Sequence, residues 1–117
     1  MNLARRDASR VPITIAVKKS VGLSNTLCQA ANISATGMLV AKVYEGFYPD
    51  LPKCWLRFNL PGSDVTIEAR GEVVRQARRD RYHLMAVRFG TLAPSHRRLI
   101  EDYIEQPKLM AAPIFAA

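Results

Sequence analysis

Residues 11–19 read VPITIAVKK, and this short stretch decides the fold of the chain. Ile13, Ile15 and Val17 alternate with Thr14, which is the period of a β-strand with one buried face. Isoleucine and valine also favour extended backbone, because their branched side chains pack well on a pleated surface. The stretch therefore predicts a half-buried first strand.

Five more segments with strand-like composition follow, separated by turn residues at intervals of about ten. They cover residues 26–34, 38–44, 53–60, 65–76 and 82–89. The short connections between them predict mostly antiparallel pairing. We expect Gly71 to mark a bend, or a place where another group approaches the backbone. We interpret residues 78–81, Arg-Arg-Asp-Arg, as an exposed hairpin tip.

A helix is predicted after the last strand, because the apolar period changes from Pro94 onward. Pro94 suits a first helical turn, and Pro107 ends the segment. One face carries an apolar stripe of Leu99, Ile100, Tyr103 and Ile104. We therefore expect a mainly β fold, a six-stranded antiparallel β-barrel whose C-terminal α-helix covers one mouth or edge.

Length and composition describe one domain of ordinary globular type. The chain has 117 residues, of which 49% are hydrophobic and 23% charged. No apolar run approaches the roughly 20 residues of a membrane span, and no signal-peptide core follows the basic start. We expect a cytoplasmic protein with no direct membrane insertion.

Candidate metal ligands and catalytic groups are scattered. Cys28 and Cys54 form no close pair, and His83 and His96 have no ligand spacing relative to them. We expect both cysteines to act as small hydrophobic residues. The carboxylates also lack the grouping that a phosphodiesterase needs. The sequence thus predicts no metal, no cofactor and no enzymatic activity.

Two short motifs narrow the meaning of the net charge of +7, which by itself suits nucleic acid, an anionic membrane face or a small anionic ligand. Residues 5–10, Arg-Arg-Asp-Ala-Ser-Arg, offer three arginines. Residues 32–37, Asn-Ile-Ser-Ala-Thr-Gly, offer an amide, a hydroxyl and a glycine turn. Arginine stays charged and can engage phosphate, or the O6/N7 edge of guanine, through two parallel hydrogen bonds. The motifs predict an anion site with a base-reading edge.

The order of these motifs resembles the PilZ domain, the bacterial receptor for the second messenger cyclic di-guanosine monophosphate (cyclic di-GMP). The resemblance covers roughly residues 5–106: Arg-Arg-x-x-x-Arg, a first strand, and Asn-x-Ser-x-x-Gly in the second hairpin. Residues 60–62, 71–75 and 86–89 are also similar to later strands of the family. The resemblance implies a PilZ-like split barrel that binds cyclic di-GMP.

The resemblance assigns ligand contacts to Arg5, Arg6, Arg10, Asn32, Ser34 and Gly37. Asn32 stands where aspartate is commoner, so the position gains a donor and loses a charge. We expect Ser34 to supply a hydroxyl donor. We expect Gly37 to adopt positive φ and to admit the ligand to backbone amides. Arg75 is a further candidate, for the second guanine.

We divide the chain into an N-terminal arginine arm (1–10), a barrel with its helix (11–106) and an apolar tail (107–117). We expect the arm to be flexible without ligand and to fold over it, so that binding presents a changed surface to a partner. We expect the tail to pack back on the barrel, with contact to another subunit or fraying as alternatives.

The partner is expected to be an effector protein or a covalently attached catalytic domain, acting on motility, exopolysaccharide or cellulose synthesis, or biofilm formation. Met1, just ahead of the first motif, favours a stand-alone protein over a module of a larger one such as a cellulose synthase subunit. Monomer or dimer, and one nucleotide or a stacked pair, stay open.

The main alternative is a small basic β-barrel that binds single-stranded nucleic acid. Such barrels usually interleave aromatic residues with cations on one face. Here the aromatic candidates Tyr44, Tyr48, Trp55 and Tyr82 are scattered along the chain. We therefore do not expect nucleic acid to be the partner.

Overall fold

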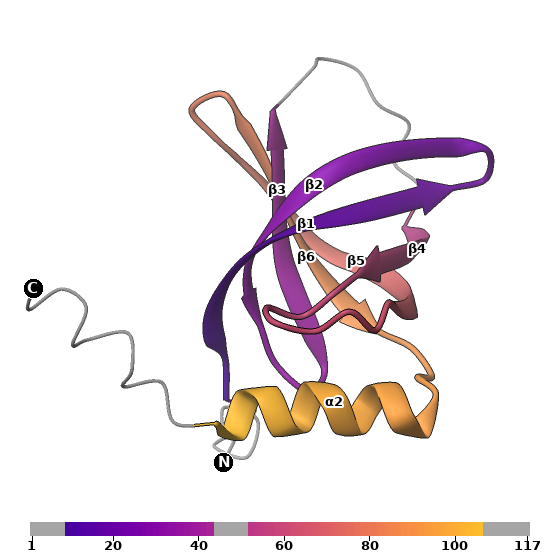
Figure 1. Cartoon of the computed structure of the whole chain (residues 1–117). Helices are drawn as coiled ribbons and strands as arrows, with labels where there is room; N and C mark the ends of the chain where they lie inside the picture. The colour runs from indigo at the N-terminus through magenta and orange to yellow at the C-terminus, as the bar shows by residue number, and fades with distance from the viewer. Residues whose placement is uncertain (1–8, 44–51, 107–117) are drawn as a thin grey trace, which may run out of the picture.

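The structure, a computed structural model, describes residues 9–43 and 52–106 of the chain. Six strands and one helix follow one another in the chain (Figure 1). They are β1 (Val11–Val21), β2 (Ser24–Ile33), β3 (Gly37–Val43), β4 (Lys53–Phe58), β5 (Ile67–Arg79), β6 (Tyr82–Phe89) and α2 (Pro94–Glu105). Each predicted strand and the predicted helix are confirmed, with small differences at their ends.

The strands form a closed barrel in the order β1-β2-β3-β6-β5-β4, and every pair is antiparallel. The seam between β1 and β4 is short, running from Lys18 opposite Arg57 to Ser20 opposite Trp55. Beyond Val73, β5 pairs with β6 alone among the described strands. This hairpin projects from the barrel and turns at Asp80, which has a φ of 58° (Figure 1). The predicted hairpin tip is thereby confirmed.

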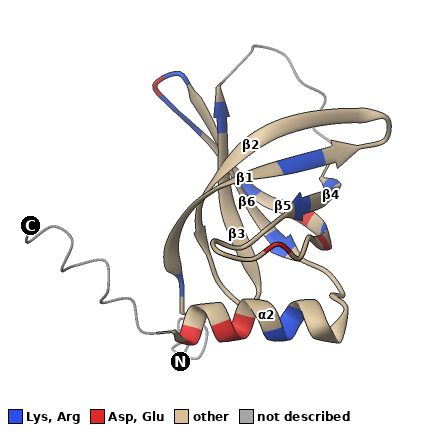
Figure 2. Cartoon of the chain, in the orientation of Figure 1, with Lys and Arg blue, Asp and Glu red and all other residues tan. Residues whose placement is uncertain are grey.

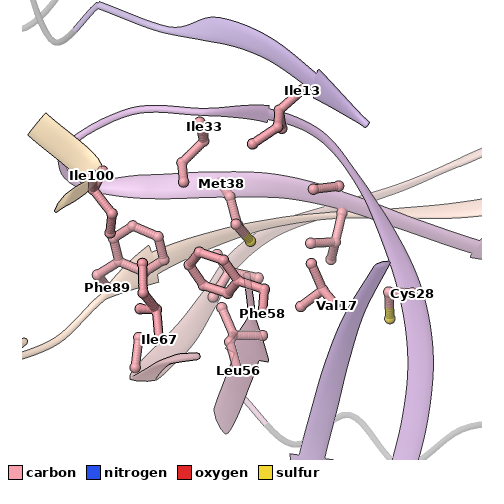
Figure 3. Close-up of a cluster of buried hydrophobic side chains, with 14 of the residues drawn as sticks. Ile13, Val17, Cys28, Ile33, Met38, Leu56, Phe58, Ile67, Phe89 and Ile100 are labelled. Atoms are coloured by element: carbon pink, nitrogen blue, oxygen red, sulfur yellow. The ribbon is translucent and has the colours of Figure 1, made fainter. Parts of the chain in front are cut away.

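Alternating side chains from all six strands fill the barrel (Figure 3). Val17, Leu56 and Ile67 are 0% exposed, and burial of each such side chain stabilises the fold by about 1.5–3 kcal/mol. Helix α2 lies across one mouth of the barrel (Figure 1). It inserts Ile100, also 0% exposed, into the core. The predicted role of the helix as a cover is confirmed.

Cys28 and Cys54 are free, and both are buried in this core. Burial raises the pKa of each thiol, because removal from water disfavours the thiolate. Neutral, buried thiols are poor nucleophiles and pack like small apolar groups. The expectation that both cysteines act as hydrophobic residues is confirmed.

Gly71 carries no β-bulge in β5. It stays in register between Cys54 and Phe89, and the irregularity in the strand lies between Val73 and Arg75. A Cβ at Gly71 would stand 2.5 Å from Cγ1 of Val87. Of the two expectations for Gly71, the close approach of another group is confirmed, and the bend stays a prediction.

The arginine arm through residue 8, residues 44–51 with Tyr44 and Tyr48, and the tail 107–117 lie outside the described residues. The proposed division of the chain and the roles of arm and tail stay predictions.

Candidate functional site

A hydrogen bond joins the two sequence motifs. Nη1 of Arg10 donates to Oδ1 of Asn32 at 2.8 Å, although the residues lie 22 positions apart. Arg10 directly precedes β1, and Asn32, near the end of β2, pairs with Pro12. The β1–β2 pairing thus brings the motifs together. Because the Asn32 oxygen accepts from arginine, its amide nitrogen remains a donor, as the edge of guanine requires.

Ser34 organises the turn between β2 and β3. Its backbone N–H donates to the Gly37 carbonyl at 2.8 Å, and its Oγ accepts from the Thr36 backbone N–H at 3.1 Å. The Oγ also lies 3.2 Å from Oγ1 of Thr36 and 3.4 Å from the Gly37 carbonyl oxygen. Serine side chains commonly fix turns in this way. Ser34 is 0% exposed, so its hydroxyl serves the turn, and direct donation to a ligand stays a prediction.

Gly37 is required by close packing and not by a left-handed backbone. Among the described glycines, positive φ occurs at Gly22 and Gly62. A Cβ on Gly37 would stand 2.3 Å from the carbonyl oxygen of Val87 and 3.2 Å from Cα of Arg88. The expectation of positive φ at Gly37 is wrong, because β6 approaches this position too closely for any side chain.

Arg88 is a candidate site residue that the sequence motifs do not contain. It lies on β6 directly opposite Gly37. Its Nη2 is 2.8 Å from Oε1 of Glu72 on β5, and its side chain is 63% exposed. Inward-facing neighbours Val87 and Phe89 indicate from sequence that Arg88 points outward. Its place beside the second motif depends on strand register, for which the sequence carries no local signal.

Arg75 lies in the same row of strand neighbours as Asn32. Asn32 is opposite Leu39, Leu39 is opposite Ala86, and Ala86 is opposite Arg75. Directly opposite residues share a face of the sheet, so Asn32 and Arg75 lie on the outer face of the barrel, three strands apart around its wall. Leu39 and Ala86 are half-buried between them. Because the barrel is closed and has six strands, its wall curves between Asn32 and Arg75, and Leu39 and Ala86 form a small apolar strip on that wall.

Arg5 and Arg6 lie outside the described residues, so their part in the site stays a prediction. Elsewhere, the basic residues are distributed over several strands and the first half of α2 (Figure 2). Within residues 9–43 and 52–106, no three His, Cys, Asp or Glu side chains gather in a way that suits a metal ion. No helix in these ranges has the length and hydrophobicity to cross a membrane.

Residues 4–106 match a family model described as the PilZ domain. No curated protein matches the chain.

Solved structures with the same fold include the inhibitor of motility of Bacillus subtilis, at a TM-score of 0.75 and 20% identity. That match covers 86% of this chain and 49% of the other, so this chain spans about half the length of the Bacillus protein.

Two further matches are themselves PilZ domains. The PilZ domain of YcgR from Escherichia coli, described with cyclic di-GMP, matches with a TM-score of 0.72 and 13% identity over 86% of this chain and 88% of that one. The PilZ domain of CeSA from a cellulose-synthesising bacterium matches with a TM-score of 0.59 and 17% identity, over 81% of this chain and 97% of that one.

Proposed function

The chain belongs to the PilZ domain family, and on that premise we propose that it is a receptor for cyclic di-GMP that signals by binding alone. The observation that carries the proposal is the hydrogen bond from Arg10 to Asn32, which joins the arginine motif to the turn motif. The description of the YcgR PilZ domain with the same dinucleotide supports it.

The ligand carries two phosphodiester charges and two guanines. Arg10, together with Arg5 and Arg6, supplies cations that do not titrate and that can bind phosphate or guanine O6 and N7. Asn32 donates its amide protons to a guanine edge while its oxygen holds Arg10. Each ligand group thereby has a partner of matching chemistry.

Ser34 and Gly37 act mainly through the shape of the turn. The Ser34 hydroxyl holds the Thr36 backbone, and Gly37 lets β6 approach the turn. The Thr36 carbonyl oxygen accepts a hydrogen bond from the Phe89 N–H at 2.8 Å, which fixes the turn to β6. A rigid turn gives the arginines a fixed surface on which to hold the dinucleotide, which lowers the entropic cost of binding.

Two further cations extend the site along the barrel wall. Arg75, exposed on β5, meets the second guanine. Arg88, opposite Gly37, exchanges part of its contact with Glu72 for a ligand phosphate. Both side chains are exposed and so need little rearrangement to reach a bound anion.

The receptor acts as a switch without a catalytic step: the arm of residues 1–10 closes over the dinucleotide, and a partner recognises the closed surface. The partner is an effector protein or an attached domain, in motility or in exopolysaccharide and cellulose synthesis. The proposal places the chain in the cytoplasm, because two buried free thiols suit a reducing compartment.

The test is calorimetric titration of the chain with cyclic di-GMP and, in parallel, with cyclic di-AMP. We expect binding of the guanine ligand only, and a loss of one to two decades in affinity for Arg10→Ala, because a charge-assisted hydrogen bond contributes about 1.5–3 kcal/mol. Arg97→Ala on α2 removes the same charge outside the two motifs and serves as the control. Equal affinity of Arg10→Ala and the parent would contradict the proposal.

A further inference from the structure

A hollow of about 420 Å³ lies at the barrel wall, and one of its lining residues is Arg88, which lies opposite Gly37 of the second motif. β4, β5, the end of β6 and the tip of the β1–β2 hairpin form its walls. Arg10, Asn32, Ser34 and Gly37 are not among its lining residues. We call it the Trp55 hollow, after the aromatic residue in its wall.

Strand register places the polar side chains of the hollow on one outward face. Trp55 lies opposite Arg70, Lys53 lies opposite Glu72, and Glu72 lies opposite Arg88. The guanidinium carbon of Arg70 is 5.2 Å from the centroid of the Trp55 ring, which is a cation–π contact. The tryptophan is nevertheless 49% exposed. The hollow thus combines an accessible indole with several cations.

The charges in the hollow do not balance. Glu72 is the acidic residue among the described lining residues, and its carboxylate is engaged by Arg88 at 2.8 Å. Lys53 and Arg70 then remain beside the indole without a carboxylate partner among the described residues. A surface with this imbalance attracts a partner that supplies negative charge.

We propose that the Trp55 hollow is a docking site for an acidic segment of a partner protein, with carboxylates at Lys53 and Arg70 and an apolar side chain against the indole. Tryptophan and arginine are the residue types that most often dominate binding energy at protein interfaces. Leu23, fully exposed at the adjoining hairpin tip, adds an apolar contact at the rim. The recess favours an inserted side chain over a flat lipid surface, which cannot fill it.

The proposal does not depend on cyclic di-GMP, so its test uses the chain without dinucleotide. A displayed library of random heptapeptides is selected on the immobilised chain, and the most enriched peptides are synthesised. Trp55 is the single tryptophan of the chain, so its fluorescence reports occupancy of the hollow directly. We expect enrichment of peptides with several Asp or Glu around an apolar residue, and a change in Trp55 emission when they bind.

Variants of the lining residues test whether the enriched peptides bind in the Trp55 hollow. Lys53→Ala and Arg70→Ala should each weaken an enriched peptide at least about tenfold, whereas Arg97→Ala on α2, with the same loss of charge, should leave it unchanged. Far-UV circular dichroism confirms that each variant keeps the fold.

Three results would overturn the proposal: no acidic enrichment, equal affinity of the hollow variants and the parent, or Arg70-dependent binding to vesicles with anionic phospholipid but not to peptides. The last result would assign the hollow to a membrane surface.

Discussion

Arg88 and Glu72 form an ion pair across β6 and β5, 2.8 Å between Nη2 and Oε1, while Arg88 also stands directly opposite Gly37 in β3. Arg88 therefore lies between the Glu72 carboxylate on one neighbouring strand and the backbone of the turn motif on the other. A bound phosphate beside Gly37 would compete with Glu72 for this guanidinium.

We expect Arg88→Ala to weaken cyclic di-GMP about tenfold, because it removes one charge-assisted contact. Glu72→Gln should tighten binding up to about fivefold, since it removes the competing partner of an exposed pair worth about 0.2–1 kcal/mol. Calorimetry measures both. Arg57→Ala breaks the comparable Arg57–Glu68 pair on β4 and β5 and should leave the affinity unchanged. Unaltered binding by Arg88→Ala would remove this residue from the site.

Gly37→Ala should lower the free energy of unfolding by about 1–3 kcal/mol, because its methyl group would collide with the Val87 carbonyl. The midpoint of thermal unfolding measures this loss. Gly90→Ala is the matched control: its Cβ would meet nothing closer than 3.5 Å, and its φ is not positive. Similar melting temperatures for the two variants would show that β3 and β6 tolerate a side chain at Gly37.

Ser34→Ala removes a hydroxyl that accepts from the Thr36 N–H inside a buried turn. We expect a loss of about 1–3 kcal/mol in stability together with weaker ligand binding, because the turn that positions the site loosens. Ser63→Ala removes the corresponding bond to Val65 in a different loop and should not alter ligand affinity. If Ser34→Ala weakens binding with unchanged thermal stability, the hydroxyl contacts the ligand directly.

The raised pKa values of Cys28 and Cys54 make stability depend on alkaline pH. Below the usual thiol pKa of 9.0, both states keep the thiols neutral and the fold loses nothing. Above it, the unfolded chain ionises first, so stability falls as pH rises. Denaturant unfolding between pH 7 and pH 10 should show this decline, and the double variant Cys28→Ala with Cys54→Ala should show less of it. Rapid alkylation of the native thiols at pH 8 would speak against their burial.

Hydrogen exchange tests the proposed closing of the arm. Amides of residues 1–10 should exchange more slowly when cyclic di-GMP is bound, because an ordered arm protects them. Amides of α2, across the barrel mouth, provide an internal reference. Unchanged exchange in the arm at saturating ligand would rule out closure and leave binding to the barrel wall alone.

The strands and the helix were predictable because an element that buries one face repeats its apolar residues at the period of a strand or a helix. Cys54, Leu56 and Phe58 alternate in β4, and Leu99 and Ile100 mark the buried stripe of α2. The fold follows from such patterns once short connections restrict the pairing.

The site was only partly predictable, because its geometry depends on contacts between distant segments. The motif containing Asn32 could be recognised, but the neighbour of Gly37 on β6 could not, since that register follows from the whole barrel. Gly37 is a second example. A glycine suits a turn, but a side chain is excluded at this position because the Val87 carbonyl lies too close. Likewise, the cation–π contact of Trp55 depends on Arg70, which lies fifteen positions away on β5.

The projecting half of β5 has a consequence for solubility. Beyond Val73 one side of this strand has no partner among the described strands, so its backbone groups offer a template for pairing with a second molecule. Arg75, Arg78 and Arg79 occupy this edge. Like charges brought together by edge-to-edge pairing repel one another, so the arginines act as gatekeepers against aggregation as well as, at Arg75, serving the proposed ligand site.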